Sequence, residues 1–205
     1  MKESASPKSR GGLAPDKYLD SKERDRLLKY VKSQADKARA LGQSRPIIDE
    51  LVVHLLDGTG LRANELCHLN IEDLPCCHKK DLVFVRNGKG NVRRTVIINP
   101  ELSKRLNAFA RQYRKGAKPN EPLLINEQGN RFSYVSLYSK ITRIGDEVGL
   151  ELHPHMLRHT YATRLYNIEK DLFFTQDQLG HASPVTTQIY AKTDNASKRR
   201  QVSQL

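Results

Sequence analysis

The chain has 205 residues, in which 35 lysines and arginines outweigh 23 aspartates and glutamates to give a formal net charge of +12. This length suffices for one domain with a real core, and the charge favours polyanionic partners, chiefly nucleic acid. No apolar run is long enough to span a bilayer, and the N-terminal MKESASPKSRGG lacks the apolar core of a signal peptide. We therefore expect a cytoplasmic protein with no membrane partner.

Residues 1–17 mix prolines, glycines, serines and charges without periodicity, and are predicted to form a flexible basic arm. A helix with apolar residues at helical spacing follows, from the candidate N-cap Ser21 to Gly42. A second helix starts at Pro46, and its broad apolar face is expected to be central core. It is predicted to break at residues 58–60, Gly-Thr-Gly, before a new short helix.

The junction at residues 58–60 has two features of an anion site. Glycines let the backbone approach a ligand closely, and the new helix N-terminus offers free N–H groups and a positive dipole end. Arg62 lies in the first turn of that helix, where the dipole disfavours a cation. Either a ligand beyond the helix compensates this arginine, or a salt bridge to Glu65 or Asp73 does.

The adjacent region holds Cys67, Cys76 and Cys77, an odd number that indicates reduced thiols rather than a disulfide framework. His68 and His78 stand beside them, so a zinc site is one interpretation. Their spacing matches no standard pair of zinc ligands, and we expect no metal site.

Residues 82–98 contain two β-rich runs around an Asn-Gly-Lys-Gly-Asn turn, which predicts a hairpin. Its tip and shoulders carry Arg86, Lys89, Arg93 and Arg94 and no acidic residue. Such a hairpin is either a solvated edge protected against aggregation or a finger that reaches into nucleic acid. The net charge favours the finger, with Arg86, Arg93 and Arg94 as DNA-binding residues.

The rest of the chain is predicted to be mostly helical. The expected elements are a helix opening at Asn99-Pro100, a short strand and turn within 122–132, a helix capped by Ser133, a central helix over 153–163 and beyond, a short helix ending at Leu179-Gly180, another from Ser183-Pro184, and a polar tail over 193–205.

The central stretch, HPHMLRHTYAT (153–163), is predicted to carry packing and chemistry on opposite faces of one helix. The apolar stripe is Leu157, Tyr161, Leu165 and Ile168, and the other face holds His155, Arg158, His159 and Ala162. Two imidazoles and a guanidinium within one turn favour a bound anion such as phosphate, or a neutral histidine. A solvated polar face at a helix start is the alternative.

Four stretches, in this order, resemble the tyrosine recombinases, also called the phage integrase family: TGLRANEL (59–66), NGKGN (87–91), HPHMLRHTYAT (153–163) and LGHASPVTTQIY (179–190). Each is weak alone, but together they are specific. The resemblance implies a mainly α (α+β) catalytic domain over residues 18–192 with a small antiparallel hairpin. The family's catalytic residues would fall on Arg62, Lys89, His155, Arg158, His181 and Tyr190, with Glu65 in support.

The resemblance implies a site-specific recombinase that breaks and rejoins DNA through a covalent 3′-phosphotyrosine. Tyr190 would be the nucleophile, because a phenol holds the phosphate as an ester and leaves again readily. The guanidiniums of Arg62 and Arg158 would clamp the phosphate oxygens, with His181 as a further donor.

Acid–base roles in the same reaction would fall on Lys89, which protonates the departing 5′ hydroxyl, and on His155, which accepts the proton of the tyrosine. His159 has no assigned catalytic step and is grouped with the DNA-binding residues. Because side chains would supply the charge stabilisation that metals give in many nucleases, the resemblance implies no metal, ATP or other cofactor.

The implied partners are double-stranded DNA, a homotetramer on paired sites that is monomeric when free of DNA, and accessory DNA-bending proteins, all at the nucleoid. Most family members carry a helical domain of about a hundred residues before the catalytic one. Only residues 1–17 stand there in this sequence, so it resembles an excised catalytic domain or a short member such as the fimbrial-switch invertases. The tail, 193–205, would be a helix exchanged between subunits or a polar end.

Two other functions are consistent with parts of this pattern. A type IB topoisomerase shares the active-site constellation, although the short chain and the spacing from His181 to Tyr190 favour a recombinase. A non-catalytic helix-turn-helix protein would account for short helices after residue 155, but would leave Arg62 and Lys89 unexplained.

Overall fold

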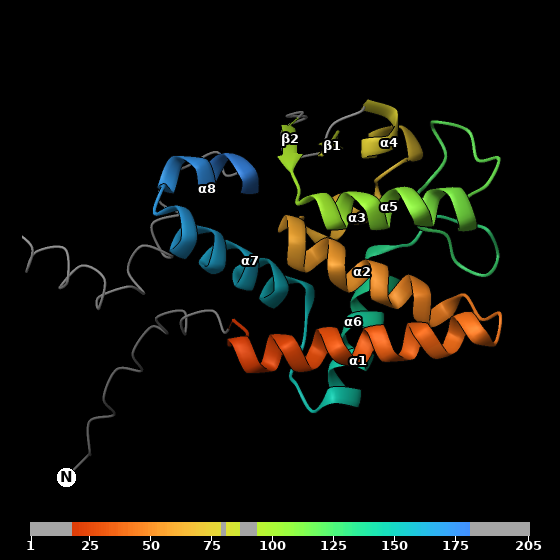
Figure 1. Cartoon of the computed structure of the whole chain (residues 1–205), viewed down its shortest axis with the longest axis horizontal. Coiled ribbons are helices and arrows are strands. Elements are labelled where there is room, and N and C mark those ends of the chain that lie inside the picture. Colours follow the sequence, from red (N-terminus) through yellow and green to blue (C-terminus); the bar gives the residue numbers. More distant parts are fainter. Residues whose placement is uncertain (1–17, 79–80, 87–93, 181–205) are drawn as a thin grey trace, which may run out of the picture.

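Helix α2 (Arg45–Thr59) lies at the centre of the computed structural model, which describes residues 18–78, 81–86 and 94–180. Around it pack α1 (Ser21–Ala40), α5 (Pro100–Tyr113), α6 (Tyr134–Val148) and α7 (Pro154–Glu169), as Figure 1 shows. The broad apolar face of α2 is buried on several sides, with Val52, Leu55 and Leu56 fully inaccessible to solvent. The predicted mainly helical fold class is confirmed.

Shorter elements complete the described part of the chain. They are α3 (Ala63–Cys67), the 3₁₀ turn η1 (Ile71–Asp73), α4 (Pro75–His78), β1 (Leu82–Val85), β2 (Arg94–Ile97) and α8 (Leu172–Leu179). The two strands pair antiparallel, with Leu82 opposite Ile97 and Val85 opposite Arg94, which confirms the predicted hairpin at its base. None of the helices described has the length and apolar character needed to cross a membrane.

Local sequence sets most of the helix starts. Asn99 and Ser133 cap α5 and α6 as predicted, each accepting a hydrogen bond from a backbone N–H three residues on. The cap of α1 is Asp20 rather than Ser21, because Asp20 accepts from the N–H of Glu23 at 2.8 Å while the Glu23 carboxylate accepts from the N–H of Asp20. This reciprocal capping box satisfies two backbone donors, which a serine one residue later would not do.

The strand predicted within residues 122–132 is wrong. The structure has two isolated bridges there, Asn70 with Pro122 and Ile125 with Arg131. The side chain of Asn126 accepts from the N–H groups of Gln128 and Asn130, and so folds the segment into a tight turn. The turn starts one residue after Ile125, which leaves too little extended backbone for a strand.

Buried carboxylates on α2 tie the surrounding helices to it. Each of the three is held by two basic side chains, so that no negative charge is buried without compensation. The groups are Asp57 with Arg24 of α1 and Arg164 of α7, Glu50 with Arg39 of α1 and Arg105 of α5, and Asp49 with Lys140 and Arg143 of α6. Arginine pairing thus holds α2 in place against four neighbouring helices.

Gly60 ends α2, two residues later than the predicted start of the break, because Gly58 and Thr59 are still helical. Its φ of +61° is left-handed, and a Cβ at this position would lie 2.4 Å from Cδ1 of Tyr161 and 2.9 Å from Cδ2 of Leu179. Only glycine therefore lets α7 and α8 approach the end of α2 this closely.

A Gly60→Ala substitution is expected to lower the free energy of unfolding by about 2–4 kcal/mol, because left-handed strain adds to overpacking against Tyr161. Gly42→Ala is the matched control, since Gly42 has a φ of +68° and a Cβ added there would have no neighbouring atom within 4 Å. It should lose about 1–2 kcal/mol from strain alone. Urea unfolding of both variants measures the difference, and equal losses would contradict the packing argument.

Candidate active site

Arg158 of α7 joins three elements of the fold. Its side chain is buried, and its guanidinium donates to the carbonyl oxygen of Gly60 at 2.5 Å and to that of Leu179 at 2.8 Å. Gly60 ends α2 and Leu179 is the last residue of α8. These bonds fix the plane of the guanidinium at the point where two of the sequence motifs meet, TGLRANEL and LGHASPVTTQIY.

The two-faced arrangement predicted for α7 is only partly correct. Leu157 is fully buried, but Ile168 at the far end of the predicted apolar stripe is 72% exposed. On the other face, Arg158 and Ala162 are buried rather than exposed. The cause is that α7 packs against α2 and also against α8, so more of its surface is covered than one apolar stripe accounts for.

His155 and His159 do share a face, one turn apart on α7. Their ring centroids are 5.9 Å apart with an angle of 34° between the planes. His155 is exposed and His159 is half-buried. At this separation two protonated rings would repel each other, so the pair favours at least one neutral imidazole or a nearby anion.

Glu65 of α3 is the acidic centre of the site, with a side chain only 2% exposed. It accepts from the backbone N–H of Arg62 at 2.8 Å and from the Arg62 guanidinium at 3.0 Å. Its two oxygens also accept a bidentate pair of bonds from Arg94 at 2.7 and 2.9 Å. The salt bridge that the sequence offered as one partner for Arg62 is therefore present, and Arg62 still keeps 34% of its side chain exposed.

Electrostatics keep the Glu65 carboxylate ionised. Burial by itself raises the pKa of a carboxyl group, but the hydrogen bonds and positive charges of Arg94 and Arg62 outweigh it and lower the pKa of Glu65 to about 2. With one carboxylate between two guanidiniums, this cluster carries a net positive charge at neutral pH.

Two arginines at the base of the hairpin, predicted to bind DNA, have intramolecular partners. Arg86 pairs with Asp73 of η1 and lies 3.6 Å from a carboxylate oxygen of Glu72. Arg94 is 8% exposed and points inward to Glu65. For Arg94 the structure differs from the sequence expectation of a surface contact, because the carboxylate that attracts it lies 29 residues away and no local pattern reveals it.

Four of the predicted site residues, Lys89, Arg93, His181 and Tyr190, lie outside the described residues. The described residues Arg86 and Arg94 flank the first two, and the described residue Gly180 immediately precedes His181. The structure therefore brings together Arg62, Glu65 and Arg158 through the turn at Gly60, with His155 on the same helix as Arg158.

Tyr161 of α7 is a tyrosine beside this cluster. It packs against Gly60, and burial raises the pKa of its phenol to about 12. A group that holds its proton this firmly is a poor source of phenolate. Tyr161 thus serves packing and leaves the nucleophile to be sought elsewhere.

Two polar residues near the site were missed by sequence reasoning. Thr160 of α7 accepts from the N–H of Leu19 at 2.9 Å, which ties the start of the described chain to α7. The Gln178 side chain accepts from the N–H of Ile97 at 3.1 Å and so attaches α8 to β2. Both contacts join residues more than 80 positions apart, and no spacing rule identifies such pairs.

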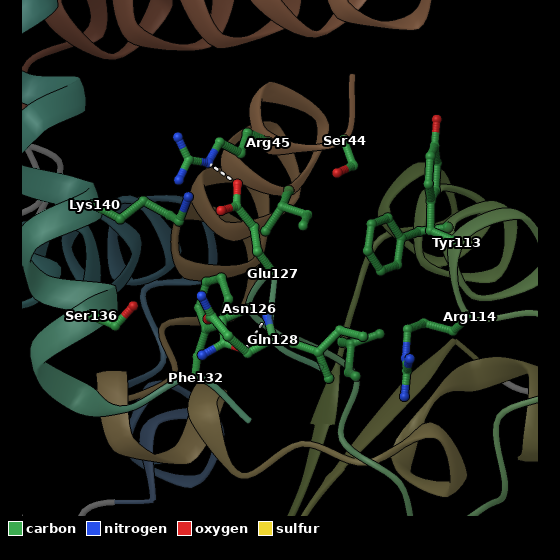
Figure 2. Close-up of a pocket in the computed structure, with 14 residues that line it drawn as sticks. Ser44, Arg45, Tyr113, Arg114, Asn126, Glu127, Gln128, Phe132, Ser136 and Lys140 are labelled. Carbon is green, nitrogen blue, oxygen red and sulfur yellow. Dashed lines mark hydrogen bonds and ion pairs between the residues drawn. The ribbon is translucent and has the colours of Figure 1, made fainter. Parts of the chain in front are cut away.

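A cavity of about 440 Å³ lies away from these residues, between the start of α2, the end of α5, the 122–132 segment and the start of α6. Figure 2 shows an ion pair between Arg45 and Glu127 beside it, with Phe132 and Tyr113 also in its lining. None of the predicted site residues that the structure describes lines it. Within the described ranges, no group of three or more His, Cys, Asp or Glu side chains is arranged to hold a metal ion.

The ionisation of Glu65 makes a prediction about stability and pH. Because its pKa is lower in the folded chain than the ordinary value of 4.5, its contribution to stability is complete above pH 4.5 and is lost as the pH falls towards 2. The difference in unfolding free energy between the wild type and Glu65→Gln should therefore shrink by about 3 kcal/mol between pH 5 and pH 2. Chemical denaturation at each pH measures it. Glu101→Gln, at a side chain 85% exposed, is the control variant, and an equal change in its difference would contradict the assignment of the effect to Glu65.

Comparison with known sequences gives the same family as the motifs. The phage integrase family profile matches residues 17–197. Tyrosine recombinase XerA of Pyrococcus horikoshii is 37% identical over 158 residues, which cover 75% of this chain and 53% of that protein. Tyrosine recombinase XerC of Roseiflexus sp. strain RS-1 is 32% identical over 200 residues, covering 92% and 63%. The chain spans about half the length of the curated XerA relatives it matches.

Solved structures are similar over most of the chain. A crystal structure of XerA recombinase superposes with a TM-score of 0.73 at 31% identity, over 91% of this chain and 64% of that one. XerH recombinase, in a post-cleavage complex with its difH substrate, gives a TM-score of 0.75 at 27% identity, over 95% and 55%. Since the family profile extends over well more than half of the residues, the chain belongs to the phage integrase family.

Proposed function

We propose that this chain is the catalytic domain of a site-specific recombinase that cleaves and rejoins double-stranded DNA through a covalent 3′-phosphotyrosine. One observation carries the proposal. Arg158 donates to the carbonyl of Gly60, and Arg62 follows two residues after that carbonyl. Arginines from motifs 96 positions apart thus meet at one turn, where the Arg158 guanidinium bonds the turn itself and the Arg62 guanidinium bonds Glu65 just beyond it, as a clamp on a single phosphate requires.

Arg158 and Arg62 are held by different contacts, and both arrangements are suited to binding a phosphate. Arg158 is fixed from behind by two backbone carbonyls, whose bonds orient the guanidinium without neutralising its charge. Arg62 is oriented by Glu65 and remains partly exposed. A guanidinium stays protonated at any working pH, so both can stabilise the charge that develops on the non-bridging oxygens of the transition state.

The remaining steps are assigned through the family resemblance. Tyr190 attacks the phosphorus and forms the phosphotyrosine as the P–O bond to the 5′ oxygen breaks. Lys89 delivers a proton to that oxygen, His155 takes the proton of the phenol, and His181 donates to a non-bridging oxygen. Rejoining runs the same steps in reverse, and the phosphotyrosine conserves the bond energy. No cofactor is assigned to any of these steps.

Partners and location follow from this chemistry and from the charge of the chain. Double-stranded DNA is the substrate, and exchange between two sites calls for a homotetramer of such domains, assembled from monomers on DNA and aided by accessory DNA-bending proteins. Recognition of DNA places the protein in the cytoplasm at the nucleoid. DNA contacts are assigned to His159, which the structure describes, and to Arg93, which lies outside the described residues. Arg94 faces inward and is not assigned a DNA contact.

A nicked suicide substrate tests the proposed reaction, because cleavage releases a short fragment and traps the protein on DNA. In EDTA and without ATP, the wild type should give a covalent band on denaturing gels. Tyr190→Phe should abolish it, since the nucleophilic oxygen is removed. Tyr161→Phe is the control and should retain the band, because the ring that packs against Gly60 is preserved.

Two outcomes would contradict the proposal. A covalent band that persists in Tyr190→Phe would assign the nucleophile to another residue. Tight DNA binding with no covalent band from the wild type, on substrates that carry candidate recombination sites, would favour a non-catalytic DNA-binding protein instead.

A further inference from the structure

Arg94 differs from the other described arginine at the base of the hairpin. The Arg86 side chain is 40% exposed, whereas that of Arg94 is 8% exposed and bonds both oxygens of Glu65 at 2.7 and 2.9 Å. This fork-to-fork arrangement is the strongest geometry available to an arginine and a carboxylate. An arginine held in this way is oriented into the protein and away from solvent.

The position of Arg94 connects three segments. Its Nε donates to the carbonyl of Gln178 at 3.3 Å, and a Cβ at Gly180 would lie only 2.7 Å from its Cδ. Arg94 is also the first residue of β2, and Glu65 lies on α3. The base of the hairpin, the end of α8 and the first motif therefore meet on one guanidinium.

Glu65 divides its bonds between two arginines. One oxygen accepts from the guanidiniums of Arg62 and Arg94, and the other accepts from the backbone N–H of Arg62 and from Arg94. With Arg94 present, the Glu65 carboxylate is held by hydrogen bonds from both arginines, and it shares its negative charge between them. Without Arg94, the carboxylate would be free to rotate and to neutralise Arg62 more completely.

We propose that Arg94 is a positioning residue that acts through Glu65 to hold Arg62 in place and cationic for the scissile phosphate. The inference rests on the proposed function above. Arg94 touches neither DNA nor the reacting atoms in this scheme. Its effect is on the rate of cleavage, because displacement of a clamping group by about 1 Å can cost ~100-fold in rate.

The experiment compares cleavage of the suicide substrate by Arg94→Ala, Arg94→Lys and the wild type. Arg94→Ala should form the covalent complex ~100-fold more slowly at saturating DNA. Arg94→Lys should fall between Arg94→Ala and the wild type, because a lysine keeps the charge but cannot bond both oxygens in a fixed plane. Lysine also guards against loss of the fold, which circular dichroism and urea unfolding check for each variant.

Arg105→Ala is the matched control for a purely structural loss. Glu50 accepts from Arg39 and Arg105, so this variant also removes one of two arginine partners from a buried carboxylate, but on the α5 side of α2. It should destabilise the chain to a similar degree and leave the cleavage rate within about twofold of the wild type. A rate for Arg94→Ala no lower than that of Arg105→Ala would overturn the inference.

The salt dependence of DNA binding separates positioning from direct contact. Each phosphate neutralised contributes about 0.9 to the slope of log K against log salt concentration. Arg62→Ala should lower the slope by about one, and adding Arg94→Ala to that variant should lower it no further, because Arg94 acts through Arg62. A further decrease of about one in the double variant would make Arg94 a DNA contact, and the inference would be wrong.

A substrate with sulfur in place of the bridging 5′ oxygen identifies the group through which Arg94 acts. A thiolate leaves without protonation, so loss of the general acid assigned to Lys89 should be rescued by this substrate. Loss of Arg94 should not be rescued, because the clamp is still impaired. Rescue of Arg94→Ala would show action through the hairpin instead and overturn the inference. Absence of any covalent complex with the wild type on either substrate would overturn the proposed function itself.

Discussion

The buried carboxylate of Glu65 is the constraint on which the candidate site depends. Taking a carboxylate out of water is costly unless cations and hydrogen bonds compensate it. Here the compensation comes from Arg62 at the start of α3 and from Arg94 at the start of β2, and their hydrogen bonds and charges lower the pKa of Glu65 to about 2. The dependence runs both ways, because two guanidiniums at one site would repel each other without the anion between them. The pairing thereby fixes the hairpin base against α3 while leaving the cluster positive.

The second arginine of the proposed clamp is held by hydrogen bonds to two backbone carbonyls. Arg158 reaches the carbonyls of Gly60 and Leu179 only because α2 and α8 both end beside α7, and both ends turn through left-handed glycines. A side chain at Gly60 would push α7 and α8 away. Placement of the guanidinium therefore follows from helix termination, and the packing of Tyr161 against Gly60 belongs to the same arrangement.

How much could be predicted depended on the range of the interactions. Helix starts at Asn99 and Ser133, the buried face of α2 and the base of the hairpin follow from patterns a few residues long, and the structure confirms them. The failures that concern the candidate site are long-range. The inward turn of Arg94 needs a carboxylate 29 residues away, and the burial of Arg158 needs helices on two sides of α7. The motifs still indicated the candidate residues, because family resemblance carries tertiary information that periodicity lacks.

Long-range polar contacts also hold the ends of several secondary-structure elements in this domain. Arg86 pairs with Asp73, the N–H of Ile97 bonds the Gln178 side chain, and Arg94 bonds both Glu65 and the Gln178 carbonyl. Each tie lies where a described element leads to a segment that carries a candidate catalytic residue. The proposed reaction aligns groups from four motifs on one phosphate. The residues from which each of these segments starts must therefore be held in place, because a displacement at the base of a segment also displaces the catalytic group that the segment carries. The proposed reaction therefore depends most on the long-range polar contacts that periodicity could not predict.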